Sequence, residues 1–162
     1  MSESATGVVH TEVMELRATP EQVRAFILTP ERILDYYPQP IEGGVLEPGQ
    51  AIWCRGEIGV SILERVAAES SDSLVVVKVT TAFGLEAPYT RERIEANVGF
   101  TMVEDWAIEA IPGGTRLTKS WRDLETPAGD GHVFAKPVRE GGIHESPQLV
   151  EGWNAAAAAA GD

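Results

Sequence analysis

The sequence contains little of what several large classes of protein require. It has one cysteine, Cys54, so an intrachain disulfide is excluded and no cysteine-based zinc or iron–sulfur site is expected. Its longest aliphatic runs, Leu74–Val77 and Ala155–Ala160, fall far short of the roughly 20 residues that span a bilayer. Residues Met1–Ser4 contain neither the basic nor the apolar region of a signal peptide, so we expect a cytoplasmic protein without a membrane span.

Positive charge is also scarce. The 13 Lys and Arg residues are outnumbered by 25 Asp and Glu residues, which gives a net charge of −12. Such a surface repels phosphate backbones and anionic lipids, so nucleic acid is not an expected partner. His10, His132 and His144 share no metal-binding spacing, and no phosphate-binding glycine motif occurs, so we expect no metal and no cofactor.

The length and the composition fit one globular domain, residues 1–162. We expect its core over 8–124 and a loop rich in glycine and proline over 125–145. Ser146-Pro147 is a helix start, and it predicts a C-terminal helix over 147–160.

Two further helix starts follow a first strand that is expected over 8–17. Thr19-Pro20-Glu21-Gln22 and Thr29-Pro30-Glu31-Arg32 each place a threonine N-cap before a proline at the first helical position. From 41 to 124, short strand runs separated by turn residues are typical of an antiparallel meander. The expected strands cover 41–46, 50–57, 58–68, 74–83, 99–111 and 115–124. Residues 88–96 fit either a charged helix or an extension of a strand.

Three of these local motifs carry a resemblance. They are Ala18-Thr19-Pro20-Glu21-Gln22-Val23, the second helix start leading to Tyr36-Tyr37-Pro38, and the turn Pro112-Gly113-Gly114-Thr115-Arg116-Leu117-Thr118. All three resemble motifs of the START-like, helix-grip (SRPBCC) superfamily, in its polyketide cyclase/dehydrase-type branch. Over about residues 8–124, the resemblance implies an α+β helix-grip fold. Its parts are a curved antiparallel sheet of about seven strands, two short helices after strand one, and a C-terminal helix.

The sequence also departs from the superfamily pattern. Thr29 stands where an aspartate is usual and Tyr36 where a tryptophan is usual. The C-terminal helix, which forms the roof of the cavity in the superfamily, is restricted to about 147–160. The roof would then be shorter, or it would be completed by a loop or by a second subunit in a homodimer.

The last predicted hairpin gives the most specific geometry. If Gly113-Gly114 forms its two-residue loop, Trp106 faces Trp121 across the hairpin, and strand alternation groups the apolar side chains on one inward face. That face carries Phe100, Met102, Trp106, Ile108, Leu117 and Trp121.

The same register places three charged residues on the inward face, where Glu104 faces Asp123 and Lys119 lies nearby. Glu104 and Asp123 would form a close carboxylate pair suited to acid–base chemistry, with Lys119 as the third candidate catalytic residue. The alternative is that all three lie at the wet end of the sheet, with Lys119 as a salt-bridge partner.

Aromatic side chains are the candidate ligand contacts, because they stack on flat hydrophobic molecules. The alternative for each is an ordinary place in the core. The predicted ligand-binding residues are Tyr36, Tyr37, Trp53, Phe83, Met102, Trp106 and Trp121.

Three functions are compatible with these features. The first is binding of a small hydrophobic or aromatic ligand, lipid or polyketide-like, between the sheet and the C-terminal helix. The second is a cyclase, aromatase or dehydratase that uses the same cavity. The third is a co-chaperone-like interaction protein whose cavity is filled by its own side chains.

Overall fold

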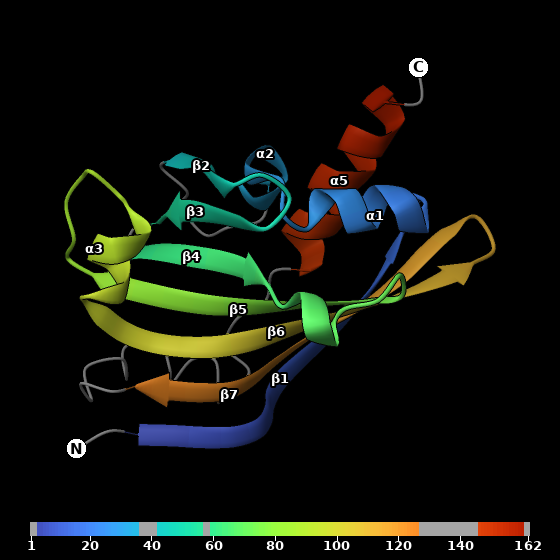
Figure 1. The fold of residues 1–162 in the computed structure, drawn as a ribbon. Helices are drawn as coiled ribbons and strands as arrows, with labels where there is room; N and C mark the ends of the chain where they lie inside the picture. The colour runs from blue at the N-terminus through green and yellow to red at the C-terminus, as the bar shows by residue number, and fades with distance from the viewer. Residues whose placement is uncertain (1–2, 36–41, 57–58, 127–145, 161–162) are drawn as a thin grey trace.

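The structure is a computed structural model, and it describes residues 3–35, 42–56, 59–126 and 146–160. Seven antiparallel strands form one sheet in the order β1-β7-β6-β5-β4-β3-β2 (Figure 1). The strands are β1 (Glu3–Leu16), β2 (Glu42–Glu47), β3 (Ala51–Arg55), β4 (Gly59–Arg65), β5 (Leu74–Phe83), β6 (Val98–Ile111) and β7 (Gly114–Thr126). The helices are α1 (Pro20–Phe26), α2 (Pro30–Ile33), the 3-10 turn η1 (Ala67–Glu69), α3 (Arg91–Glu95) and α5 (Ser146–Ala160). The predicted α+β helix-grip architecture is confirmed.

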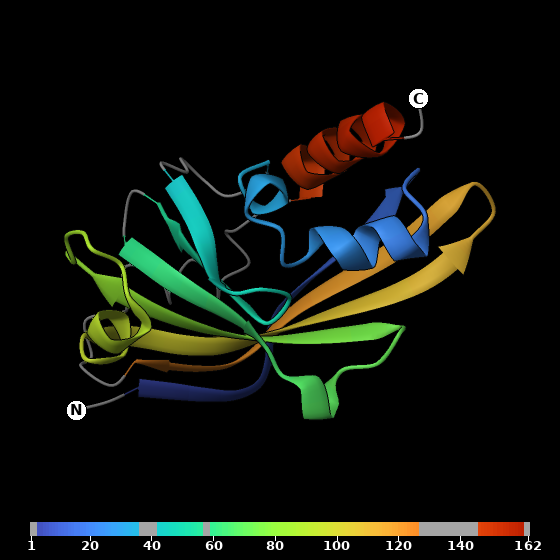
Figure 2. The same ribbon diagram turned by 45° about the horizontal axis from the view of Figure 1, so that its top comes forward.

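The sheet is curved, and α1, α2 and α5 lie together on its concave side (Figure 2). The helix α5 packs against β1 and α1, so it covers the end of the sheet where the long strands β6 and β7 meet β1. Leu149 and Trp153 of α5 are fully buried in the core cluster between these layers.

The two short helices begin at their predicted positions, but their caps differ. The backbone N–H of Gln22 donates to the Thr19 hydroxyl, and the backbone N–H of Thr19 donates to the Gln22 side chain, which completes a capping box. The Thr29 hydroxyl instead donates to the carbonyl of Ala25 at 2.6 Å. Thr29 therefore ties the end of α1 to α2 rather than capping α2.

The predicted register of the β6–β7 hairpin is wrong by two residues. Ile111 pairs with Gly114, so the loop residues are Pro112 and Gly113. Gly113 has φ +84°, which suits the second loop position, and proline fixes the backbone of the first. Gly114 lies in the strand instead, where the carbonyl of Leu16 approaches too closely to allow a side chain. Because a two-residue slip preserves alternation, the predicted inward face is retained.

Residues 88–96, for which the sequence left two alternatives, contain the helix α3. The Thr90 hydroxyl accepts from the backbone N–H of Arg93 and so caps it. Ile94 of α3 is buried in a second core cluster with Val60, Ile62 and Ala82, on the convex side of the sheet. The helix therefore covers the face opposite to α5 and does not act as a lid over the concave side.

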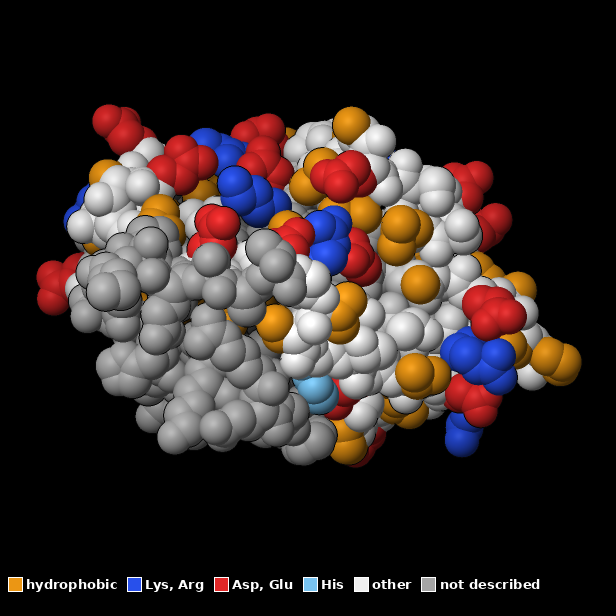
Figure 3. Space-filling model, turned by 90° about the horizontal axis from the view of Figure 1, so that it is seen from below, with side chains coloured by type: hydrophobic (Ala, Val, Ile, Leu, Met, Phe, Trp, Pro, Cys, Tyr) orange, Lys and Arg blue, Asp and Glu red, His pale blue; other side chains and the backbone are white. Residues whose placement is uncertain are grey.

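Two strands are longer than expected. β1 begins at Glu3 rather than Val8, and β7 continues to Thr126. The outer side of the sheet carries ion pairs such as Arg122 with Asp105 at 2.7 Å and Arg116 with Glu109 at 3.2 Å. Figure 3 views the molecule from below and shows acidic and basic side chains lying beside one another on the described part of the surface in that view.

Candidate ligand-binding site

The concave face of the sheet is the candidate site. Every side chain of the predicted inward set is at most 7% exposed. The set comprises Phe100, Met102, Trp106, Ile108, Leu117 and Trp121. Across the sheet, the face continues through Val77 and Val79 of β5 and Leu63 of β4, which belong to the same core cluster. Contact with such an apolar surface removes the surface of a hydrophobic molecule from water, which is why this face is the candidate site.

Lys119 is completely buried in this apolar face, which is rare for lysine. Its Nζ lies 4.2 Å from the ring centroid of Trp106 and 4.4 Å from that of Trp121. It also forms a salt bridge of 3.3 Å with Oε2 of Glu104. Two indole faces and one carboxylate thus offset the hydration that the ammonium loses on burial.

This arrangement corrects the predicted pairing. Trp106 faces Lys119 rather than Trp121, and Trp121 faces Glu104. The ion pair of Lys119 with Glu104, one of the predicted alternatives, is present, but it lies in the interior and not at a wet end of the sheet.

Glu104 retains one open hydrogen-bonding position. Its residue is 5% exposed, and within the described part of the chain its Oε1 atom has no hydrogen-bond partner. Buried polar atoms are nearly always partnered in folded proteins. The open oxygen is therefore a specific acceptor in an otherwise apolar surface.

Asp123 is not part of this cluster, and the predicted carboxylate pair with Glu104 does not form. The register of β6 and β7 shifts at this point, and Asp123 adopts φ +54°. Its carboxylate accepts from the backbone N–H of Gly7 at 2.9 Å and from Arg122 at 2.6 Å. The Gly7 hydrogen bond, followed by Arg122, holds the pKa of Asp123 below its usual value.

The helix α5 closes one end of the concave face. The Trp153 ring stacks on that of Trp106 with centroids 5.8 Å apart, and it meets the Phe26 ring edge to face with centroids 5.5 Å apart. Its indole N–H donates to the carbonyl of Arg32 at 2.9 Å. The sequence predicts only the helix that contains Trp153. Its contact with Trp106 follows from the three-dimensional packing and has no local signal.

The remaining predicted ligand contacts are in different places. Phe83 lies beside Phe100, with centroids 5.7 Å apart, at the end of the concave face away from α5. Trp53 lies on the opposite side of the sheet, against Tyr89 at 5.1 Å, and packs with the second core cluster. Tyr36 and Tyr37 lie outside the described residues, as do His132 and His144.

A second polar pair that the sequence did not single out lies on the concave face. The hydroxyls of Ser61 and Thr81 are 2.7 Å apart and buried, so they satisfy each other. Their strand neighbour Cys54 is also buried, and as the one cysteine of the chain it forms no intrachain disulfide. Because the two hydroxyls bond to each other, this part of the concave face is less polar than its residue types indicate.

No group of three or more His, Cys, Asp or Glu side chains that could hold a metal ion occurs within the described ranges. The helices described above include none that is both long enough and apolar enough to cross a membrane.

Comparisons with known proteins identify the fold. No family model and no curated protein matches the sequence. A START superfamily protein from Mycobacterium smegmatis aligns over 92% of this chain and 96% of its own, with 12% identity and a TM-score of 0.55. A conserved protein from Geobacillus kaustophilus gives a TM-score of 0.65 at 11% identity, covering 92% and 94% of the two chains. A Thermus thermophilus protein gives 0.59 at 17% identity, covering 94% and 99%. The chain therefore has the fold of a START superfamily protein, and the polyketide cyclase branch stays a prediction.

Proposed function

We propose that the protein binds a small hydrophobic molecule, aromatic, lipid-like or polyketide-like, against the concave face of the sheet beside Lys119 and Glu104. The observation that carries this proposal is the open Oε1 atom of Glu104, buried in an apolar surface. The ion pair with Lys119 accounts for Oε2 of Glu104 but leaves Oε1 buried without a partner among the described residues. A ligand that supplies a donor would satisfy this second oxygen.

In this proposal, the ion pair and the apolar side chains around it contact different parts of the ligand. Lys119 occupies Oε2 of Glu104 and keeps the carboxylate fixed, so Oε1 has a defined direction. Met102 and Val77, which flank Glu104 along β6 and across on β5, offer apolar contact to the rest of the ligand. The preferred ligand is therefore mainly apolar and carries one hydroxyl or similar donor.

The enzymatic alternative is a cyclase, aromatase or dehydratase. It was based on two facing carboxylates, Glu104 and Asp123, and Asp123 is turned toward Gly7 and Arg122 instead. Acid–base chemistry would then fall to Glu104 and Lys119 alone. For this reason we favour binding over catalysis, and turnover of a polyketide-like substrate would reverse that preference.

A matched pair of ligands tests the proposal without altering the protein. We expect 2-naphthol, which carries a hydroxyl donor, to quench tryptophan fluorescence and to bind about tenfold more tightly than 2-methoxynaphthalene, because only the first can donate to Glu104. Equal affinities would refute the role of Glu104. If neither compound quenches the fluorescence, native mass spectrometry of the purified protein and extraction of any bound molecule decide between two explanations. Either the protein binds a different ligand, or its own side chains fill the space beside the concave face.

The variant Trp121→Phe tests whether the tryptophans are ligand contacts or only core. It keeps an aromatic ring and most of the side-chain volume, but it replaces the indole that contacts the Lys119 ammonium with a smaller ring. A change in 2-naphthol affinity supports the ligand role. Lower thermal stability with unchanged affinity for a panel of flat hydrophobic compounds leaves the tryptophan a purely structural role.

A further inference from the structure

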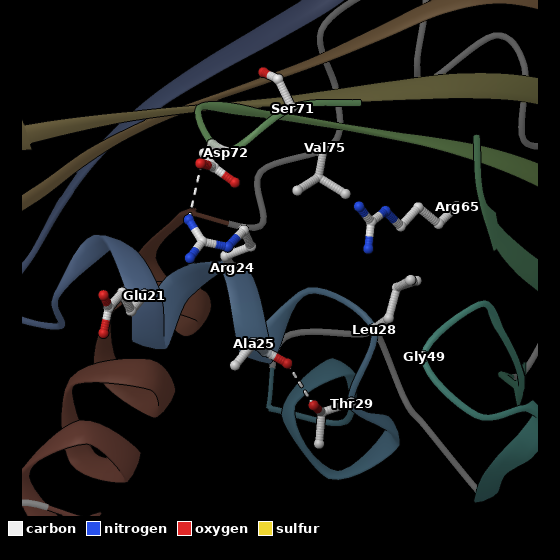
Figure 4. A pocket seen from close by; sticks show the side chains of 10 residues that line it. All are labelled: Glu21, Arg24, Ala25, Leu28, Thr29, Gly49, Arg65, Ser71, Asp72 and Val75. Atoms are coloured by element: carbon white, nitrogen blue, oxygen red, sulfur yellow. Dashed lines mark hydrogen bonds between the residues drawn. The ribbon is translucent and has the colours of Figure 1, made fainter. Parts of the chain in front are cut away.

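A separate pocket of about 510 Å³ opens between α1, the start of α2 and the turns that follow β2 and β4 (Figure 4). Leu28 and Val75 form apolar parts of its wall, and Val75 is 4% exposed. Val75 is also the strand partner of Trp106, so the pocket adjoins the core. The residues that line it include none of those proposed to bind the hydrophobic ligand.

Two arginines from different elements meet at this pocket. The guanidinium of Arg65, at the end of β4, enters the space between Val75 and Leu28, and Arg24 of α1 lies on the other side of that space (Figure 4). Nη1 of Arg24 donates to the main-chain carbonyl of Asp72 at 3.0 Å, which holds the side chain in place.

Neither of these two arginines forms an ion pair with a carboxylate in the described structure, even though the chain carries 25 acidic residues. Arg91, by contrast, bonds to three carboxylates, and Arg122 bonds to three as well. Two guanidinium groups left without such partners in a strongly acidic chain have donors available for an anion.

We propose that this pocket binds the carboxylate of a small amphiphilic acid, with Arg24 and Arg65 on the carboxylate and Leu28 and Val75 on its aliphatic part. The guanidinium fork matches the geometry of a carboxylate. The side chains of Glu21 and Asp72 also line the pocket, so its formal charges cancel. A singly charged carboxylate with a short apolar chain therefore fits better than a doubly charged phosphate.

The test is an NMR titration of the whole protein with hexanoate at low salt. We expect the methyl resonances of Leu28 and Val75 to shift, whereas those of Ile94, which packs on the opposite face of the sheet, stay in place. The variants Arg24→Gln and Arg65→Gln should each weaken binding by about tenfold, the typical effect of losing one charge-assisted hydrogen bond. Arg17→Gln, which removes the same charge at an exposed site at the end of β1, is the matched control and should leave the affinity unchanged.

Three results would overturn the proposal. The first is hexanol binding as tightly as hexanoate, because the arginines would then have no role. The second is an unchanged hexanoate affinity in the double variant, and the third is inorganic phosphate binding as tightly as hexanoate. The Leu28 and Val75 shifts are measured on the unaltered protein, so the location of binding is tested even if a variant is unstable. The hexanoate results do not depend on the concave face. If 2-naphthol failed to bind there, they would still decide this proposal.

Discussion

Gly152 of α5 lies directly against Asp35 at the end of α2. A Cβ atom at position 152 would lie 2.6 Å from Cβ of Asp35 and 3.1 Å from its Cγ. Next to this contact, Trp153 donates to the carbonyl of Arg32, so two successive residues of α5 fix its position against α2. The absence of a side chain at Gly152 thus sets how closely the covering helix approaches.

Gly152→Ala is expected to lower the melting temperature, although alanine favours a helix by about 1 kcal/mol over glycine. The clash with Asp35 involves Cβ, the least movable atom of that side chain, so α5 would have to shift away. Thermal unfolding of Gly152→Ala and of the exposed control Glu151→Ala measures this effect. In the pair Gly152→Ala with Asp35→Gly, the clash is gone and the two changes should be strongly non-additive. A rise in melting temperature for Gly152→Ala alone would contradict the contact.

The buried ion pair should behave as a unit. Lys119→Met leaves the Glu104 carboxylate in the core without its cation, and we expect a loss of about 3–5 kcal/mol in the free energy of unfolding. Glu104→Gln should be comparably costly, because the buried ammonium then loses the charge of its carboxylate partner. Combining the two changes removes both charges and should recover much of the loss, which urea unfolding of the four proteins measures.

The control for this cycle is the exposed pair of Arg116 with Glu109, where Arg116→Gln should change stability by less than about 1 kcal/mol. Strictly additive losses at Lys119 and Glu104 would show that the charges do not depend on each other.

Whether a sequence prediction was correct depended on how much exact geometry it required. The inward face of β6 and β7 was correct because alternation survives a two-residue slip, whereas the Trp106–Trp121 pairing required the exact loop and was wrong. The pairing of Glu104 with Asp123 depended on the same loop and was wrong for the same reason. The register shift that turns Asp123 toward Gly7 and Arg122 has no local sequence signal. The pocket at Arg24 and Arg65 was not predictable at all, since it depends on how α1 is placed over the turn after β4.

Asp123 should stabilise the protein most at neutral pH. The Gly7 N–H and Arg122 keep its pKa in the folded state below the unfolded value of 3.8. A depressed folded pKa contributes stability above 3.8, and this is lost as the pH falls through the folded value. The stability difference between the wild type and Asp123→Asn should therefore shrink below pH 4. Asparagine is the informative substitution, since it tolerates φ +54° and isolates the charge. A difference that stays constant from pH 7 to pH 3 would show that the charge has no part in it.

Asp35 should show the opposite pH dependence. Burial raises its pKa above 3.8, and the Arg32 guanidinium at 3.2 Å offsets only part of that shift. A group whose folded pKa is raised holds its proton more tightly in the folded state, so stability present below pH 3.8 is lost as the pH rises through the folded value. Asp35→Asn has no charge to bury, and its stability relative to the wild type should increase from pH 3 to pH 6. Urea unfolding of Asp35→Asn and Asp123→Asn over the same pH series gives slopes of opposite sign. Slopes of the same sign would mean that Arg32 lowers the pKa of Asp35 by more than burial raises it. A charged carboxylate at the contact of α5 with α2 would then cost no stability.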